Sequence, residues 1–413
     1  MSLIRPFRGL RPAPGRADAV VAPPYDVLNT EEARERAIGR SNSFLHISKP
    51  EIDLPAGTNP HAPEVYDKGR DNFVRMIEEG VLVRDESPCY YIYRLIMGEH
   101  VQTGLVAVSS VADYDTNRIR KHEFTRPDKE DDRVRQIDAL NTQTGPVFLT
   151  YRHSVLIDDI TTSIVAGSPA MDVVADDGVQ HTVWVVDDTA MLESITREFD
   201  AMECIYIADG HHRSAAASRV AMQRKAANSN HTGREDYNYF LSVIFPDNQM
   251  QILDYNRVVT DLNKQTAEEF LAAVTVSFTV TESSEPVKPQ TSAEYGMYLQ
   301  GQWYRLGINP DLIPADDPVG CLDISLLANN LIEPILGISD PRRDKRIDFV
   351  GGIRGLAELE KRVDSGEMAV AFSLYPTSLT QLMNVADAGE VMPPKSTWFE
   401  PKLADGLVSH MLD

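Results

Sequence analysis

The sequence predicts an α+β protein with mixed sheets and flanking helices. Strand-like and helix-like segments follow one another without the regular strand–helix–strand alternation of a parallel α/β sheet. Two apolar segments, 89–95 and 102–111, are joined across Gly98 and predict an antiparallel hairpin. Hydrophobic residues make up 42% of the chain and charged residues 25%, which is typical of globular domains and excludes disordered and fibrous classes.

The length of the chain predicts how many domains it has, and its net charge limits the kinds of partner that it can bind. A chain of 413 residues predicts two or three domains, which we expect at 1–150, 151–280 and 281–413. Lys and Arg total 40 and Asp and Glu total 62, so the net charge is −22 and nucleic acid is disfavoured as a partner. The chain has three cysteines and no CxxC pair. It also shows neither a secretory signal nor an apolar run of membrane length. We therefore expect a soluble cytoplasmic protein with no membrane partner.

Helices and strands are expected where the apolar period and the capping residues agree. A Pro-Pro corner follows a short strand at 20–22, and Asn29 is placed to cap the next helix. The remaining helices are predicted from Glu64 to Gly80 and at 190–199, 214–227, 324–332, 354–365 and from 379. Further strands are predicted at 146–151, 183–186, 204–208, 240–245, 253–259, 297–306 and 369–374.

The strongest chemical pattern is the run Asp209-Gly210-His211-His212-Arg213, between an apolar strand and an alanine-rich helix. Glycine permits a tight turn, and the free N–H groups of a helix N-terminus favour anions such as phosphate. Arginine adds donors for phosphate, histidines act as donors or as an acid/base pair, and the aspartate could hold Mg²⁺ or accept a proton. The alternative is structural: the aspartate only caps the helix and the histidines form hydrogen bonds inside the fold.

A second candidate is the polar segment around His122 and Glu123, which precedes a charged helical stretch. Side chains ahead of a helix can converge on a ligand, and Glu123 is suited to act as a general base or as a partner of a metal-bound phosphate. The alternative is a solvated helix with pairs such as Asp131 and Arg135.

A third candidate is the loop in which Pro393-Pro394 precedes Lys395, Ser396 and Thr397. A positioned ammonium group and two hydroxyls suit phosphate, although the glycines of a P-loop are missing. The alternative is a rigid domain-docking loop that Trp398 and Phe399 anchor. Weaker candidates are Tyr25 and Asp26 as pocket residues, with turn capping by the aspartate as the alternative, and Arg257 as an ion-pair partner.

These motifs together resemble a known family. The segments at 22–27, 121–123, 208–213, 254–257 and 392–397 resemble a widespread prokaryotic family catalogued as a domain of unknown function. The run from Asp209 to Arg213 is similar to the phosphate-binding segment of the ParB/sulfiredoxin-like superfamily, and of free serine kinases within it. This resemblance implies a ParB/sulfiredoxin-like core with an additional α/β domain. It also implies that Gly210, His211, His212 and Arg213 contact phosphate, with Asp209 beside a divalent metal or the substrate.

The function predicted on this basis is phosphoryl transfer to a small molecule. ATP or ADP would be the co-substrate with Mg²⁺, and free serine or a similar hydroxyl amino acid the acceptor. Glu123, Asp209 and His211 are the predicted catalytic residues. Substrate contacts are predicted for Tyr25, Asp26 and His122, and further phosphate contacts for Lys395, Ser396 and Thr397. Two alternatives stay open: a nucleotide-binding regulatory switch with little catalysis, and a non-nucleotide hydrolase with His211 or His212 as base.

Overall fold

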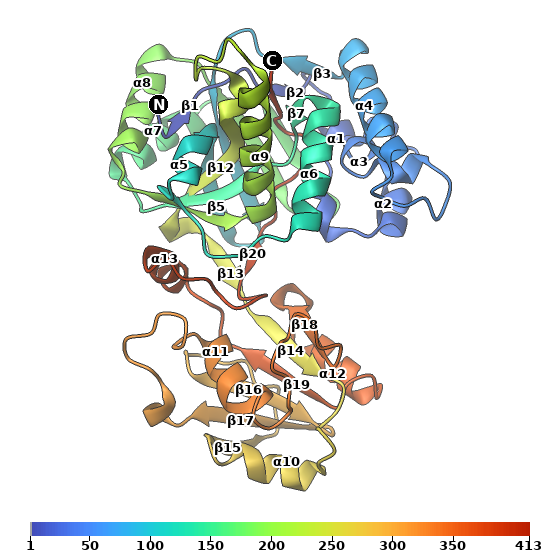
Figure 1. Ribbon diagram of the computed structural model, residues 1–413, viewed down its shortest axis with the longest axis vertical. Helices are drawn as coiled ribbons and strands as arrows, with labels where there is room; N and C mark the ends of the chain where they lie inside the picture. Colours follow the sequence, from blue (N-terminus) through green and yellow to red (C-terminus); the bar gives the residue numbers. More distant parts are fainter. Residues whose placement is uncertain (1) are drawn as a thin grey trace. The chain divides into compact units, whose positions relative to one another are not determined.

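The computed structural model describes residues 2–413, which divide into two compact units (Figure 1). The first unit runs to Met250 and resumes at Pro401–Asp413, and the second unit is Gln251–Glu400. These limits differ from the three ranges expected from the sequence, 1–150, 151–280 and 281–413. The reason is that strands from both sides of residue 150 pair in one sheet, and that the C-terminal segment returns to the first unit.

A mixed nine-stranded sheet forms the centre of the first unit. Its strands run in the order β6-β11-β8-β12-β5-β4-β10-β9, with β1 also paired to β5. Pairing is parallel for β11 with β6 and for β12 with β8, and antiparallel elsewhere, including the predicted hairpin of β4 and β5. The bounds are β1 Ile4–Arg5, β4 Tyr90–Met97, β5 His100–Ser110, β6 Ile119–Arg120, β8 Val147–Tyr151, β9 Met171–Val174, β10 Gln180–Val186, β11 Ile205–Asp209 and β12 Tyr239–Pro246.

Helices pack around this sheet, and two short strand pairs complete the unit. The helices are α1 Ala17–Val20, α2 Thr30–Ala37, α3 Leu45–Ser48, α4 Pro63–Glu78, α5 Val111–Asp115, α6 Pro127–Leu140, α7 Val155–Val165, α8 Thr189–Ala201 and α9 His211–Ala227. The strand pairs join β2 Leu10–Pro12 with β3 Leu82–Arg84 and β7 Thr142–Gln143 with β21 His410–Met411. Asn29 caps α2 as predicted, with Glu32 completing a capping box.

The short strand expected at 20–22 is wrong in part. Val20 ends helix α1, and only Ala22 takes up strand-like pairing, in an isolated bridge with Asp405. Two backbone hydrogen bonds of 2.9 and 3.1 Å join Ala22 and Asp405. This bridge brings the C-terminal segment beside the N-terminal one, which no local sequence pattern indicates.

Helix α9 lies close to the sheet because its buried face is made of small side chains. Ala216 and Ala217 are buried, and α9 also packs against α6. The core beneath contains the strand residues Leu149, Ile207 and Ile244. Close approach of α9 places its first turn beside the ends of β11 and β8.

The second unit contains a six-stranded antiparallel sheet in the order β15-β17-β16-β19-β14-β18. Its strands are β14 Tyr255–Val259, β15 Phe278–Ser283, β16 Glu294–Leu299, β17 Gln302–Ile308, β18 Ile347–Gly351 and β19 Val370–Leu374, and a separate pair joins β13 Gln251–Leu253 with β20 Trp398–Glu400. Its helices are α10 Ala267–Val274, α11 Asp323–Leu327, α12 Leu356–Asp364 and α13 Leu379–Asp387. The helix predicted at 324–332 is present, but it changes from α to π geometry at Ala328.

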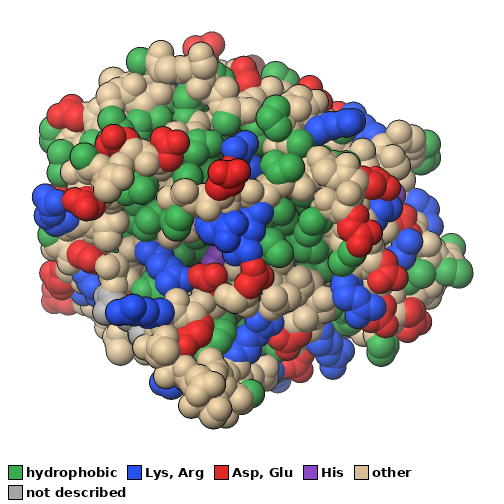
Figure 2. Space-filling view, turned by 90° about the horizontal axis from the view of Figure 1, so that it is seen from above, with side chains coloured by type: hydrophobic (Ala, Val, Ile, Leu, Met, Phe, Trp, Pro, Cys, Tyr) green, Lys and Arg blue, Asp and Glu red, His purple; other side chains and the backbone are tan. Residues whose placement is uncertain are grey.

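The surface shows no concentration of one charge on the face drawn in Figure 2, where acidic, basic and apolar side chains alternate. Among the helices described in residues 2–413, none combines the length and the hydropathy that a membrane span requires.

Candidate functional site

The predicted strand–turn–helix is present at residues 205–227. Strand β11 ends at Asp209, helix α9 begins at His211, and Gly210 between them is the N-cap residue with φ +96°. That left-handed conformation favours glycine. A Cβ at this position would lie 3.2 Å from Nε of Arg213 and 3.3 Å from Cα of Val147, so the turn also lacks room for a side chain.

The N-terminus of α9 carries backbone donors that the helix itself does not use. The first bond of the helix runs from Ser214 N–H to the Gly210 carbonyl at 3.0 Å, so the three preceding N–H groups have no intrahelical acceptor. No side chain among the described residues caps this end. The carboxylate of Asp209 instead accepts the Gly210 N–H at 2.7 Å, so the alternative in which it caps the helix does not hold.

Arg213 lies at the centre of a cluster of opposite charges. Its guanidinium donates to the Pro146 carbonyl and lies 3.6 Å from the Asp26 carboxylate and 3.9 Å from that of Asp209. Burial opposes the charge of Arg213, but Asp26 and Asp209 more than compensate and raise the pKa of the guanidinium. The fold therefore brings Asp26 close to Arg213, although the two residues are distant in the chain.

Asp209 is held in its ionised form by two cations. Burial alone would raise the pKa of Asp209, but Lys402, with Nζ 3.6 Å from the carboxylate, and Arg213 hold that pKa well below its usual range. The side chain of Asp209 keeps 37% of its surface exposed. An ionised carboxylate thus stands beside two cationic groups, next to the free end of α9.

Two buried histidines lie behind the turn. The rings of His122 and His211 meet edge to face with centroids 4.5 Å apart. Burial lowers the pKa of His122 to about 4, and burial together with His122 lowers the pKa of His211 well below its usual value, so both are neutral at pH 7. Nδ1 of His122 is buried without a hydrogen-bond partner. An unsatisfied buried nitrogen of this kind costs stability.

Contacts with its neighbours define the proton position on His211. Its Nε2 accepts the His122 backbone N–H at 3.5 Å, which places the proton on Nδ1. Nδ1 lies 3.8 Å from the carboxylate of Glu123, whose side chain is 52% exposed. The structure therefore brings together three residues that the sequence analysis proposed from two separate motifs.

His212 has a different environment. Its Nε2 accepts the backbone N–H of Arg126 at 3.1 Å, and burial lowers its pKa. This bond ties the segment that carries Glu123 to the first turn of α9, so His212 positions that segment.

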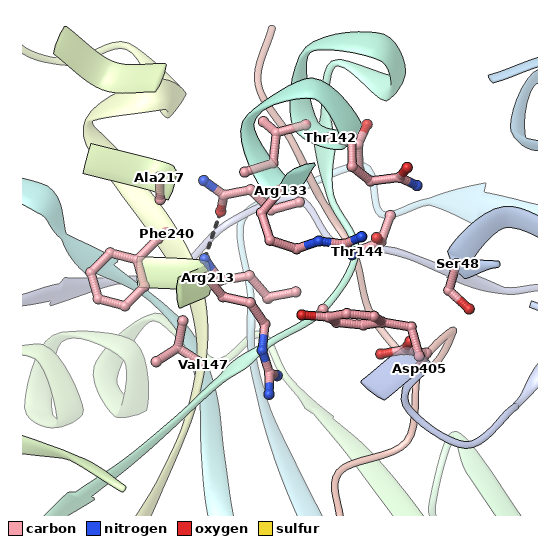
Figure 3. A pocket seen from close by; sticks show the side chains of 15 residues that line it. Ser48, Arg133, Thr142, Thr144, Val147, Arg213, Ala217, Phe240 and Asp405 are labelled. Carbon is pink, nitrogen blue, oxygen red and sulfur yellow. Dashed lines mark hydrogen bonds between the residues drawn. The ribbon is translucent and has the colours of Figure 1, made fainter. Parts of the chain in front are cut away.

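A small cavity adjoins Arg213 inside the first unit (Figure 3). Its volume is about 30 Å³, and Tyr25, Thr144, Arg133, Arg213 and Asp405 are among its lining residues. Space of this size holds one or two water molecules and excludes a nucleotide. The Arg133 guanidinium lies 3.9 Å from the centre of the Tyr25 ring, and burial raises the pKa of Asp405 to about 7.

Lys402 and Asp405 were missed in the sequence analysis, and Arg133 was noted there only as part of a charged run. The first two belong to the C-terminal segment that returns to the first unit, and neither stands in a motif that points to this site. Arg133 lies in the charged stretch that we assigned to a solvated helix as one alternative. Its burial against Tyr25 comes from the fold alone.

The sequence analysis assigned Asp209 at this turn to a divalent metal. No group of three or more His, Cys, Asp or Glu side chains within residues 2–413 is arranged to hold a metal ion. Asp209 is next to Lys402 and Arg213 instead. Since Mg²⁺ often binds through one carboxylate together with substrate phosphates, Asp209 fits that ion only when a phosphate is present.

The third sequence candidate, Lys395–Thr397, belongs to the second unit and is described with it. The Ser396 hydroxyl donates to the Pro393 carbonyl, and the Thr377 hydroxyl donates to the Ser396 carbonyl at 2.9 Å. Arg257 donates to the Lys395 carbonyl at 2.9 Å. Arg257 was expected to form an ion pair, and this is wrong within the described residues, because it contacts carbonyl groups and aromatic rings instead.

Comparison with known proteins identifies a family and distant structural similarities. A model of a family described as "Protein of unknown function (DUF1015)" matches residues 4–325. No curated protein sequence matches the chain. A free serine kinase in complex with AMP is 12% identical, with a TM-score of 0.35, and the match covers 71% of this chain and 86% of that one.

Two further solved structures are similar at the same level. SbnI with a C-terminal truncation, from Staphylococcus aureus, is 12% identical with a TM-score of 0.38, and the match covers 72% of this chain and 84% of that one. A conserved hypothetical protein from Pyrococcus furiosus is 13% identical with a TM-score of 0.34, with coverage of 75% and 97%. Scores this low carry no argument about activity. The predicted membership of a family of unknown function is confirmed by the family match.

Proposed function

Because the chain belongs to the DUF1015 family, whose description names no activity, we propose a function from the site itself: a nucleotide-dependent phosphotransferase that acts on a small molecule with a hydroxyl group. The observation that carries this proposal is the uncapped N-terminus of α9 with Arg213 in its first turn. Phosphate is the ligand that free helix N–H groups and a guanidinium favour together.

Arg213 is poised to change partners. Its contacts with Asp26 and Asp209, at 3.6 and 3.9 Å, are longer than the 2.7–2.9 Å of a direct charge-assisted hydrogen bond. A phosphate oxygen at hydrogen-bond distance would therefore replace a weaker contact. Since the cavity behind Arg213 is too small for a nucleotide, the phosphates would lie on the exposed side, where Asp209 and Asp26 are partly open to solvent.

Phosphoryl transfer needs positioning and charge neutralisation more than covalent chemistry by the protein. The acceptor hydroxyl oxygen would attack the terminal phosphorus of ATP or ADP, its proton would pass to the Glu123 carboxylate, and the shortened nucleotide would leave. Glu123 is half-exposed and lies 3.8 Å from Nδ1 of His211, whose N–H would stabilise the glutamate as a base. Mg²⁺, held by Asp209 and phosphate oxygens, would neutralise charge on the phosphates.

Titration calorimetry with ATP and ADP, with and without Mg²⁺, tests the binding part. We expect Arg213→Ala to weaken nucleotide binding by about 1.5–3 kcal/mol, the range of a hydrogen bond to a charged group. Arg219→Ala is the control, because Arg219 is on the same helix but pairs with Glu130 and Asp131. Equal affinities in both variants, or no nucleotide binding by the wild type, would refute the assignment.

A turnover assay tests the catalytic part. Free serine and other hydroxyl amino acids would be incubated with ATP or ADP and Mg²⁺, and the phosphorylated product measured. Product with one acceptor is the expected result. Nucleotide binding without any product would favour the alternative of a regulatory switch. The observation that supports a switch is the Arg213–Asp26 contact, because a phosphate bound to Arg213 would release the segment that carries Asp26.

A further inference from the structure

The second unit contains a buried cation that no carboxylate of residues 2–413 neutralises. Arg257 on β14 is 6% exposed. Its guanidinium donates to the carbonyls of Tyr255 and Lys395 and lies 5.2 Å from the centre of the Phe349 ring. Among the described residues no acidic side chain serves as its ion-pair partner, and Tyr255 is the one group whose charge acts to raise its pKa. Burial lowers the pKa of this guanidinium to about 10.

The nearest acid in the sequence does not fill this role. The Asp254 carboxylate accepts the Asn256 side-chain amide at 2.5 Å. Because side chains alternate along a strand, Asn256 lies on the opposite face of β14 from Arg257. A buried charge without a counter-ion costs several kcal/mol, and carbonyl groups offset only part of that cost.

A second cation lies beside this arginine in an unfavourable backbone conformation. Lys395 has φ +58°, a region that non-glycine residues seldom adopt, and its carbonyl is the one that Arg257 binds. Its side chain is exposed, and its ammonium nitrogen lies 5.7 Å from the centre of the Tyr255 ring. No carboxylate within the described part of the chain pairs with it. Strain of this kind in an ordered loop is frequently associated with function.

The two cations are held by a rigid aromatic and glycine framework. The ring of Tyr255 meets Trp398 at 5.1 Å and Phe349 at 6.0 Å, both edge to face. A Cβ on Gly351 would lie 2.7 Å from the Trp398 ring, so glycine is required for this packing. This packing therefore holds the buried guanidinium of Arg257 in place, while the Lys395 side chain is exposed.

We propose that Arg257 and Lys395 form an oxyanion-binding site in the second unit, for a phosphate or carboxylate group of a small molecule. The guanidinium provides directed donors, and the exposed ammonium adds a flexible point charge. This site rests on the second unit alone and does not depend on the function proposed for α9. Ser396 is not part of it, because its hydroxyl is used by the Pro393 carbonyl.

Fluorine NMR of the full chain labelled with fluorotryptophan gives a local readout. The chain has three tryptophans, and Trp398→Phe identifies the signal of Trp398. Inorganic phosphate and malonate would be titrated separately, at constant ionic strength set with chloride. A saturable shift of the Trp398 signal with one anion, with Trp184 in the first unit unchanged, is the expected result. Phosphate and malonate thus distinguish the two sources of oxyanion.

Matched lysine variants test the assignment. Lys395→Asn removes the ammonium group while asparagine tolerates the positive φ. Lys264→Asn is the control, because Lys264 is an exposed lysine of the same unit with φ +64°. We expect Lys395→Asn to weaken binding about tenfold, the effect of losing one charge-assisted contact, and Lys264→Asn to leave it unchanged. The proposal would be overturned if neither phosphate nor malonate shifts the Trp398 signal. It would also be overturned if the two variants change the affinity for the anion equally.

Discussion

Replacement of Asp405 by asparagine should make the protein more stable at neutral pH. Asp405 is 2% exposed and lines the cavity beside Arg213. Burial raises its pKa to about 7, although Arg213 and Arg133 act in the opposite direction. An unfolded aspartate has a pKa of about 3.9, so the folded state binds this proton more tightly.

The sign and size of the effect follow from proton linkage. A carboxyl group with a raised folded pKa contributes stability below the unfolded pKa and loses it as the pH rises through the folded value. The pKa of Asp405 rises from about 4 in the unfolded state to about 7 in the folded state. At 1.36 kcal/mol for each pKa unit, ionised Asp405 lowers the free energy of unfolding by about 4 kcal/mol. Asparagine does not titrate, so the stability of Asp405→Asn relative to wild type should rise by about 3 kcal/mol between about pH 5 and about pH 8.

Urea unfolding at several pH values, followed by tryptophan fluorescence, measures this difference. Trp184 lies on β10 and reports on the unfolding of the first unit. Asp18→Asn is the control, since Asp18 is exposed and the same charge is removed. Titration of groups remote from Asp405 is common to variant and wild type and cancels. A stability difference that stays constant over the pH range would refute the reasoning.

Two further predictions concern the turn before α9. Gly210→Ala should destabilise the first unit by about 1–3 kcal/mol in urea unfolding, because alanine would hold a positive φ and contact Arg213. Gly39→Ala is the control, because Gly39 has φ +73° and open space around it, so this variant measures the stability lost by placing alanine at a positive φ. An equal loss of stability in both variants would show that contact with Arg213 does not contribute. Nucleotide affinity should not change between about pH 5.5 and about pH 7.5 through His122 or His211, because burial keeps both neutral there. A change in nucleotide affinity with a midpoint near about pH 6.5, absent from His211→Asn, would show that His211 takes up a proton in this range.

Local sequence patterns were sufficient for most elements of the fold. The hairpin of β4 and β5, the cap of α2 at Asn29 and the strand–turn–helix around Gly210 depend on neighbouring residues, and each is present. The mixed α+β class follows from the same patterns. The π turn after α11 was missed, because helical periodicity does not distinguish one extra residue in a turn.

Charge partners, in contrast, were decided by long-range packing. Asp209 is ionised because Lys402, nearly two hundred residues later, lies 3.6 Å away, and Asp405 reaches the cavity through its pairing with Ala22. Within the part of the chain that the structure describes, Arg257 has no carboxylate partner for the same reason, since the residues that face it come from another strand and a distant loop. Sequence by itself predicted the strand–turn–helix around Gly210 and the candidate phosphate-binding residues within it. Only the tertiary structure decided which charges meet, because electrostatic energy depends on distances in space and on burial.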